Sequence, residues 1–381
     1  MGLDRVPISA GRDLLRAHPA RVVLAVLFGA WVAAPSAQAP TQESTWQIAK
    51  DADAAGFDAK RLAVLREWLN TQHTSALVVW SRGKVAFQYG DVARISKVAS
   101  VRKSILAMLY GKYVVDGTID LDATVKQLGL DDVQPFQPIE ERATLRHLLT
   151  ARSGIYHPAG NAQLEALSPK RGSHPPGTYF QYQNWDFNAA GTAFEKRTGK
   201  NLFDALDTDL ARPIDMEDFD RRRQRKIDVR PASVHPEYAM YLSTRDLARI
   251  GVLMARQGRW NGREVVPRDW VEAITTLVTR PEDIHPEQLG ATSWAHRWGY
   301  GMLWWVWDTP NIPGTATGPY QGAFTAMGAH GQYITVLPLL DLVVAHQVAF
   351  DEEDERQGRP IAEVAPDEYD AILQIIVVAR R

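Results

Sequence analysis

The β-rich segments of this chain lie toward its two ends, and this order restricts the folds open to it. Near one end, the run "ALVVWSRGKVAFQYGD" contains two β-rich stretches around Arg82-Gly83, which predicts a hairpin. Strand-like sequence returns only after about residue 295, in four runs: "GYGMLWWVW", "AFTAMG", "QYITVLP" and "DLVVAHQV". Because strands joined by hairpins are antiparallel, these runs argue against a doubly wound parallel sheet. We therefore expect an α/β (α+β) fold with one antiparallel sheet built from both chain ends and flanked by helices.

Helical sequence fills the region between the strands and also flanks it. Residues 58–72 carry apolar side chains at helical spacing, and "PDEYDAILQIIVVARR" closes the chain as a helix. Four further helix candidates lie between the two β-rich regions: "ATLRHLLTARSG", "NAAGTAFEKRTGKNLFDAL", "STRDLARIGVLMARQG" and "PRDWVEAITTL". We therefore expect residues 40–117 and 296–381 to form the sheet domain and residues 118–295 to form an inserted, mostly helical domain.

Composition excludes several classes of function. An apolar fraction of 45% over 381 residues suits a globular protein with a large core. The chain has no cysteine, which excludes disulfides, zinc-thiolate sites and a thiol nucleophile. The formal net charge of −2 gives no electrostatic basis for binding nucleic acid. The ten histidines show no metal-ligand spacing, so we expect neither a metal nor another cofactor.

The first 39 residues have the order of a secretory signal. Arg12, Arg16 and Arg21 precede an apolar run at 22–34, which the small residues "PSAQA" follow. This run is too short for an ordinary transmembrane helix, although an uncleaved membrane anchor is the alternative. We expect residues 1–39 to be a signal peptide and the mature protein to be periplasmic or secreted, without membrane attachment.

The stretch "ASVRKSILAMLYG" (99–111) places a serine three residues before a lysine at the start of a predicted helix. Val101, Ile105 and Leu109 recur at i, i+4 and i+8, so the helix is amphipathic and Ser100 lies near its N-terminus. Residues at i and i+3 share a helix face, so the Ser100 hydroxyl and the Lys103 amine can meet. A serine becomes a nucleophile when a neighbouring base takes its proton, and a neutral lysine can do this.

This spacing alone does not settle a catalytic role. Ser81 and Lys84 have the same spacing, but Gly83 between them marks a hairpin turn rather than a helical face. The alternative for Ser100 is a solvated polar first turn of an ordinary helix.

Two later segments add candidates. Tyr182-x-Asn184 lies in a predicted loop just before a helix, where a tyrosine can relay a proton and an asparagine can hold the lysine or a substrate carbonyl. Gly328 and Gly331 punctuate a predicted strand, along which a substrate could lie with a backbone N–H directed at its carbonyl oxygen. His330 is more readily a loop residue than a catalytic base.

Taken together, these motifs resemble the serine β-lactamase and penicillin-binding-protein superfamily. The segments "SVRKSILAMLYGKYVVDGTIDLDATVKQLGLDD", "TLRHLLTARSGI", "YQNWDFNAAG", "STRDLARIGVLMARQGRW" and "GQYITVLPLLDLVV" are similar to its class C-like esterase and amidase branch, which includes the nylon-oligomer (aminohexanoate-dimer) hydrolases. The resemblance runs from about residue 58 to the C-terminus.

The resemblance implies a role for each candidate. Ser100 would be the nucleophile, Lys103 its base and Tyr182 the proton relay. Asn184 aligns with the asparagine of the family's Tyr-x-Asn motif. The oxyanion hole would be the N–H groups of Ser100 and Ala329, the latter placed by the register of the strand that ends near Gly328.

The third motif departs from the β-lactam-processing members. Those members carry Lys-Thr-Gly, whose lysine helps to bind a substrate carboxylate, whereas the matching stretch here is Ala326-Met327-Gly328. This predicts a neutral small-molecule ester or amide as substrate. A D,D-peptidase or class C-like β-lactamase is the first alternative, and a non-catalytic ligand-binding protein on the same fold is the second. The sequence does not indicate the oligomeric state.

An aromatic group is a candidate wall for the substrate pocket, although strand tryptophans usually belong to the core. It consists of Trp185, Trp298, Trp304, Trp305 and Trp307.

Overall fold

The computed structural model describes residues 46–160, 162–286, 298–307, 318–350 and 352–381. The predicted signal peptide at 1–39 lies outside these residues. Contacts group residues 42–381 into one unit, so the expected sheet and helical regions are parts of one body. In the described part of the chain, no helix is both long enough and apolar enough to cross a bilayer.

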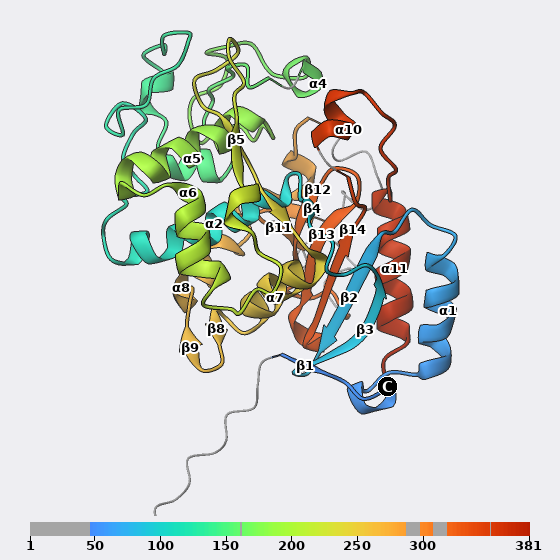
Figure 1. The fold of residues 1–381 in the computed structure, drawn as a ribbon. Coiled ribbons are helices and arrows are strands. Elements are labelled where there is room, and N and C mark those ends of the chain that lie inside the picture. Colours follow the sequence, from blue (N-terminus) through green and yellow to red (C-terminus); the bar gives the residue numbers. More distant parts are fainter. Residues whose placement is uncertain (1–45, 161, 287–297, 308–317, 351) are drawn as a thin grey trace, which may run out of the picture. The chain divides into compact units, whose positions relative to one another are not determined.

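The central element is an eight-stranded sheet (Figure 1). Its strands, in spatial order, are β1 (Gln47–Ile48), β3 (Lys84–Gly90), β2 (Ala76–Ser81), β14 (Leu342–Gln347), β13 (Gln332–Leu337), β12 (Phe324–Gly328), β11 (Trp305–Trp307) and β10 (Trp298–Tyr300). The pairing of β2 with β14 joins the two ends of the chain, as expected. All neighbours are antiparallel except β1, which adds two residues in parallel to β3 at one edge.

Turn chemistry fixes the register of the N-terminal hairpin. Arg82 and Gly83 both have positive φ, 50° and 86°, and they connect β2 to β3. Two consecutive left-handed residues form the turn that matches the right-handed twist of antiparallel strands. The prediction of a hairpin here is confirmed.

Helices cover both faces of the sheet. Helices α1 (Ala59–Leu69) and α11 (Pro366–Val378) lie side by side on one face (Figure 1), where the ring of Tyr369 stacks on Tyr333 at 3.9 Å. The opposite face packs against α2 (Val101–Val115) and α7 (Thr244–Ala255). Gly251 allows this close approach, because a Cβ there would lie 2.4 Å from Cγ1 of Val343.

The remaining α-helices are mostly short, and all but α10 lie between strands in sequence. They are α3 (Leu145–Leu149), α4 (Ala162–Glu165), α5 (Asn184–Thr198), α6 (Leu202–Ala205), α8 (Arg268–Ile274) and α10 (Glu352–Arg356). Three two-stranded ribbons accompany them: β4 (Ser96–Lys97) with β7 (Tyr241–Leu242), β5 (Arg225–Ile227) with β6 (Glu237–Ala239), and β8 (Arg259–Trp260) with β9 (Arg263–Glu264).

Two details differ from the expected arrangement. Helix α7 falls within 118–295, the range expected to form the inserted helical domain, yet it packs on β2, β13 and β14 and so belongs to the sheet layers. The run "GYGMLWWVW" is not one strand but the hairpin β10–β11, in which Leu303 takes a φ of 62°. Both differences arise because apolar periodicity reports burial but not which neighbour buries a residue.

Candidate functional site

Ser100 sits at a sharp bend between β4 and α2. Ala99, just before it, has a φ of 45°, a left-handed conformation that is unfavourable for a residue with a Cβ. A residue distant in the chain holds this bend in place: the Val98 N–H donates to the Met240 carbonyl at 3.0 Å. Ser100 is the N-cap of α2 and its side chain makes no capping bond, so the hydroxyl is free for other partners. Strained backbone of this kind concentrates at functional sites.

Lys103 lies one helical turn further and reaches back to the serine. Its Nζ donates to Ser100 Oγ at 2.6 Å and to the Tyr182 hydroxyl at 3.0 Å. Burial lowers the pKa of Lys103 well below its ordinary value, the nearby Arg102 lowers it further, and Glu237 opposes both. The rings of Tyr182 and Phe187 lie 4.7 and 4.8 Å from Nζ and exclude water from it. A buried lysine of this kind is available as the neutral amine that a general base must be.

Tyr182 reaches the same point from a loop 79 residues further along the chain. Its own N–H donates to the His285 carbonyl at 2.8 Å, and the preceding residue donates to the Ala151 carbonyl at 2.9 Å. Burial raises the pKa of Tyr182 to about 12, although the hydrogen bond with Ser100 and the charge of Arg102 partly offset this. The phenol therefore stays protonated and can donate. The structure thus brings together Ser100, Lys103 and Tyr182, the three residues predicted to be catalytic.

A partly buried ion-pair network lies next to these groups, and no sequence pattern indicates it. The Arg102 guanidinium donates to Asn188 Oδ1 at 2.9 Å and lies 3.7 Å from Glu237 Oε1. Lys97 Nζ lies 3.6 Å from the same carboxylate and also contacts Glu355 at 2.5 Å. Arg102 is only 4% exposed, so its charge acts on Lys103 through protein rather than through water.

The end of β12 lies directly against the nucleophile. A Cβ on Gly328 would lie 3.0 Å from the backbone N of Ser100 and 2.8 Å from the Val98 carbonyl oxygen. Ala329, the predicted second oxyanion donor, follows in the exposed turn that leads to β13. Ala326 is fully buried within β12, so no cation stands at this third-motif position.

Other sequence candidates lie elsewhere. Asn184 begins α5, and within the described part of the chain no hydrogen bond joins its side chain to Lys103, so its role toward the lysine or a substrate stays a prediction. His330, with a φ of 66°, lies in the β12–β13 turn with its ring 5.0 Å from that of Phe350. Ser81 and Lys84 face each other across the hairpin, where Ser81 Oγ accepts from Arg380 and Lys84 donates to the Ala54 carbonyl.

All five tryptophans proposed as a pocket wall are buried. Trp185 donates to Asp132 at 2.6 Å and is a core residue. Only Trp305 has a ring close to the reactive groups, 5.6 Å from that of Tyr182. Tyr300, which sequence reasoning missed, lies edge-on to Tyr182 at 6.1 Å.

Comparison with known proteins agrees with this geometry. The family model described as Beta-lactamase matches residues 71–365, most of the chain. The chain belongs to the Beta-lactamase family. It is therefore a hydrolase of that family, related to the penicillin-binding proteins and to the aminohexanoate-dimer hydrolases.

Individual relatives of this Beta-lactamase-family chain are distant. A 6-aminohexanoate-dimer hydrolase of Paenarthrobacter ureafaciens is 27% identical over 329 residues, which cover 78% of each protein. Among solved structures, a β-lactamase from Mycobacterium bovis has a TM-score of 0.54 at 21% identity, covering 82% of this chain and 98% of that one. A penicillin-binding protein from Bacillus halodurans has a TM-score of 0.56 at 14% identity, covering 83% and 98%. These structures confirm the β-lactamase/transpeptidase-like fold.

Proposed function

We propose that this protein is an exported serine hydrolase that cleaves an ester or amide through an acyl-enzyme on Ser100. One observation carries the proposal: Lys103 Nζ lies within hydrogen-bond distance of both Ser100 Oγ, at 2.6 Å, and the Tyr182 hydroxyl, at 3.0 Å. A nucleophile, a base and a second proton carrier in mutual contact are what acyl transfer requires.

In the proposed reaction, neutral Lys103 takes the hydroxyl proton as Ser100 Oγ attacks the substrate carbonyl carbon. The N–H groups of Ser100 and Ala329 stabilise the oxyanion that forms, a contribution typically of about 3–4 kcal/mol for each donor. Tyr182 then gives its proton to the leaving group and recovers one from Lys103. A water molecule repeats the sequence on the acyl-enzyme, which releases the acid and restores the Ser100 hydroxyl.

The buried Ala326 bears on the substrate. An alanine cannot bind a carboxylate beside the scissile bond, which favours an ester or amide that is uncharged at that position over a β-lactam. The 6-aminohexanoate-dimer hydrolase among the relatives supports an amide as one substrate class. The rings of Trp305, Tyr182 and Phe187 supply apolar surface next to the reactive groups.

A substrate panel tests this function. We expect p-nitrophenyl esters of short acids to be cleaved with a higher kcat/KM than nitrocefin, linear uncharged amides to be cleaved slowly, and Ser100→Ala to abolish all turnover. A Ser104→Ala variant is the matched control, because Ser104 is one residue beyond Lys103 and donates to the Leu303 carbonyl at 2.5 Å. Efficient nitrocefin cleavage would favour the lactamase alternative, and no turnover of any substrate would favour a ligand-binding protein.

Export forms a separate part of the proposal. The arginines and the apolar run of residues 1–39 support a cleaved signal and a periplasmic or secreted location. N-terminal sequencing of the protein from a cell-envelope fraction should give a start between about residues 35 and 42. An intact Met1 in the cytoplasm or in the membrane pellet would contradict it.

A further inference from the structure

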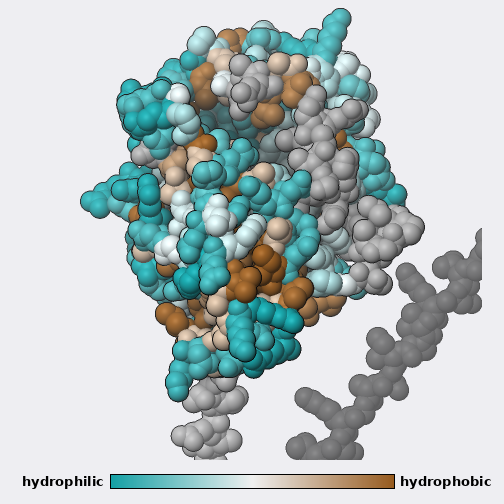
Figure 2. Space-filling model, turned by 90° about the vertical axis from the view of Figure 1, so that its right-hand side faces the viewer, coloured by the Kyte–Doolittle hydropathy of each residue, from teal (hydrophilic) through white to brown (hydrophobic). Residues whose placement is uncertain are grey.

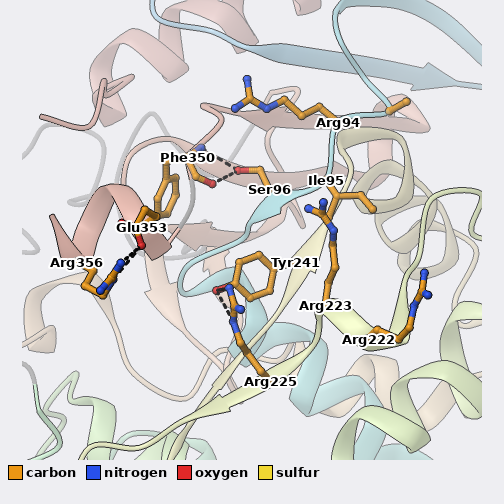
Figure 3. Close-up of a pocket in the computed structure, with 11 residues that line it drawn as sticks. Arg94, Ile95, Ser96, Arg222, Arg223, Arg225, Tyr241, Phe350, Glu353 and Arg356 are labelled. Atoms are coloured by element: carbon orange, nitrogen blue, oxygen red, sulfur yellow. Dashed lines mark hydrogen bonds and ion pairs between the residues drawn. The ribbon is translucent and has the colours of Figure 1, made fainter. Parts of the chain in front are cut away.

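A cavity of about 960 Å³ lies beside the nucleophile-bearing segment, and arginines dominate its lining (Figure 3). Five of its eleven lining residues are arginines, against one carboxylate, Glu353. They come from the segment before β4, from residues 222–225 and from α10, and are Arg94, Arg222, Arg223, Arg225 and Arg356. The volume suits a ligand the size of a small organic molecule.

Three of these arginines already have partners inside the protein. Arg222 pairs with Asp220 at 3.0 Å, and Arg356 pairs with Glu353. Arg225 donates to the Tyr241 hydroxyl at 3.1 Å, with its guanidinium over the same ring.

Two arginines are left without such partners. In the described part of the chain, neither the Arg94 nor the Arg223 side chain has a hydrogen bond or an ion pair. Figure 3 shows Arg94 across the top of the view, from the segment before β4, and Arg223 below it, from the segment before β5. Both side chains are solvent-exposed, so an anion could bind to them without displacing a partner inside the protein. The planar guanidinium donates in pairs to carboxylate or phosphate oxygens.

The cavity is connected to the nucleophile by a short stretch of chain and by one ring contact. Ser96 lines it and precedes Ser100 by four residues, a length of chain that spans at most about 14 Å. Phe350 lines it as well, and its carbonyl accepts from Ser96 Oγ at 2.6 Å. The Phe350 ring also contacts His330, the neighbour of Ala329. One wall of the cavity therefore continues into the turn that carries the predicted oxyanion donor.

We propose that this cavity binds the anionic end, carboxylate or phosphate, of an organic substrate whose ester or amide bond reacts at Ser100. The role as a substrate subsite rests on the proposed hydrolase function, whereas anion binding in the cavity does not. The proposal refines the expectation of a neutral substrate. The substrate is uncharged beside the scissile bond, near Ala326, and carries its negative charge at the far end, in the cavity. The apolar faces of Ile95, Tyr241 and Phe350 suit the organic part of such a ligand.

Matched substrates test the subsite. p-Nitrophenyl esters are prepared with acyl chains of increasing length that end in a carboxylate, a phosphate or a methyl ester. At the length that reaches the cavity, we expect kcat/KM for the charged esters to exceed that for the methyl ester by about tenfold, the size of one good charge-assisted hydrogen bond. Whichever charged terminus shows the larger advantage identifies the natural group.

The double variant Arg94→Ala/Arg223→Ala should bring this ratio close to one. Arg268→Ala, an exposed arginine on α8, is the matched control and should keep the full ratio. Equal rates for charged and methyl esters at every length, or a ratio that survives in the double variant, would overturn the subsite.

A binding measurement separates this inference from the hydrolase function. Sebacate, a linear dicarboxylate, is titrated into the wild-type, the double variant and Arg268→Ala proteins by calorimetry. We expect it to bind the wild type and Arg268→Ala and to bind the double variant about tenfold more weakly. This result supports the anion site even if no ester is cleaved, and equal affinity for all three proteins contradicts the site even if esters are cleaved.

Discussion

Replacing Gly328 with alanine probes how closely β12 packs against the nucleophile. The new Cβ would lie 2.8 Å from the Val98 carbonyl oxygen and 3.0 Å from the Ser100 nitrogen, where ordinary contacts begin at 3.4 Å. Both neighbours are backbone atoms, so neither can rotate away. The strand or the bend at Ala99 must therefore shift by roughly half an ångström.

Catalysis is sensitive to shifts of this size. A misplacement of about 1 Å at a reacting centre can cost about 100-fold in rate, so half of that predicts a loss of about tenfold. The loss should appear in kcat more than in KM, because the displaced groups are the nucleophile and the oxyanion donors, which act mainly in the transition state. Steady-state hydrolysis of a p-nitrophenyl ester measures both constants.

Gly83→Ala is the control for this substitution. Gly83 lies in the β2–β3 turn with no atom near its Cβ position, and its φ is 86°. Alanine there should lower the thermal midpoint through backbone strain without lowering kcat. If Gly328→Ala keeps the wild-type kcat, β12 does not position the nucleophile and the reasoning fails.

Three further predictions concern protonation and packing. The rate of ester hydrolysis should rise with pH as buried Lys103 loses its proton. Lys103→Arg should be nearly inactive because arginine stays charged, and an active Lys103→Arg variant would point to another base. Burial lowers the pKa of His157, but the hydrogen bond from its ring to Asp132 and the nearby Glu140 carboxylate raise it to a net value above the ordinary one. The folded state therefore holds this proton more tightly than the unfolded chain does. The resulting stabilisation is complete below about pH 6.5 and is lost as pH rises through the folded pKa. The thermal midpoint of the wild type should fall over that pH range, and the thermal midpoint of His157→Gln should not. Gly251→Ala should destabilise the protein by about 1–3 kcal/mol in urea unfolding, because its Cβ overlaps side chains of the sheet; an unchanged midpoint would contradict the packing of α7.

The sequence indicated the local parts of the fold and site well. The Arg82-Gly83 turn, the helix that begins after Ser100 and the strands β12 to β14 follow from patterns within a few residues. The contact between Ser100 and Lys103 follows from the i, i+3 geometry of one helix. These features depend on neighbours in the chain, so they can be predicted from a single sequence.

The remaining features depend on residues distant in the chain. Tyr182 could be connected to Lys103 only through the family resemblance, because no local pattern links residues 79 apart. The pairing of Arg102 with Glu237 has no sequence signature, since most arginines are exposed and solvated. The left-handed conformation of Ala99 could not be predicted for a different reason. Alanine has no preference for that conformation, and tertiary contacts impose it.

The site of covalent labelling tests the central claim most directly. The protein is treated with a fluorophosphonate, and the modified peptide is identified by mass spectrometry in the wild type and in Ser100→Ala. We predict one adduct, on Ser100, formed faster as pH rises and absent from the variant. An adduct on Ser81, Ser153 or Ser243, or labelling that persists in Ser100→Ala, would show that Ser100 is not the nucleophile.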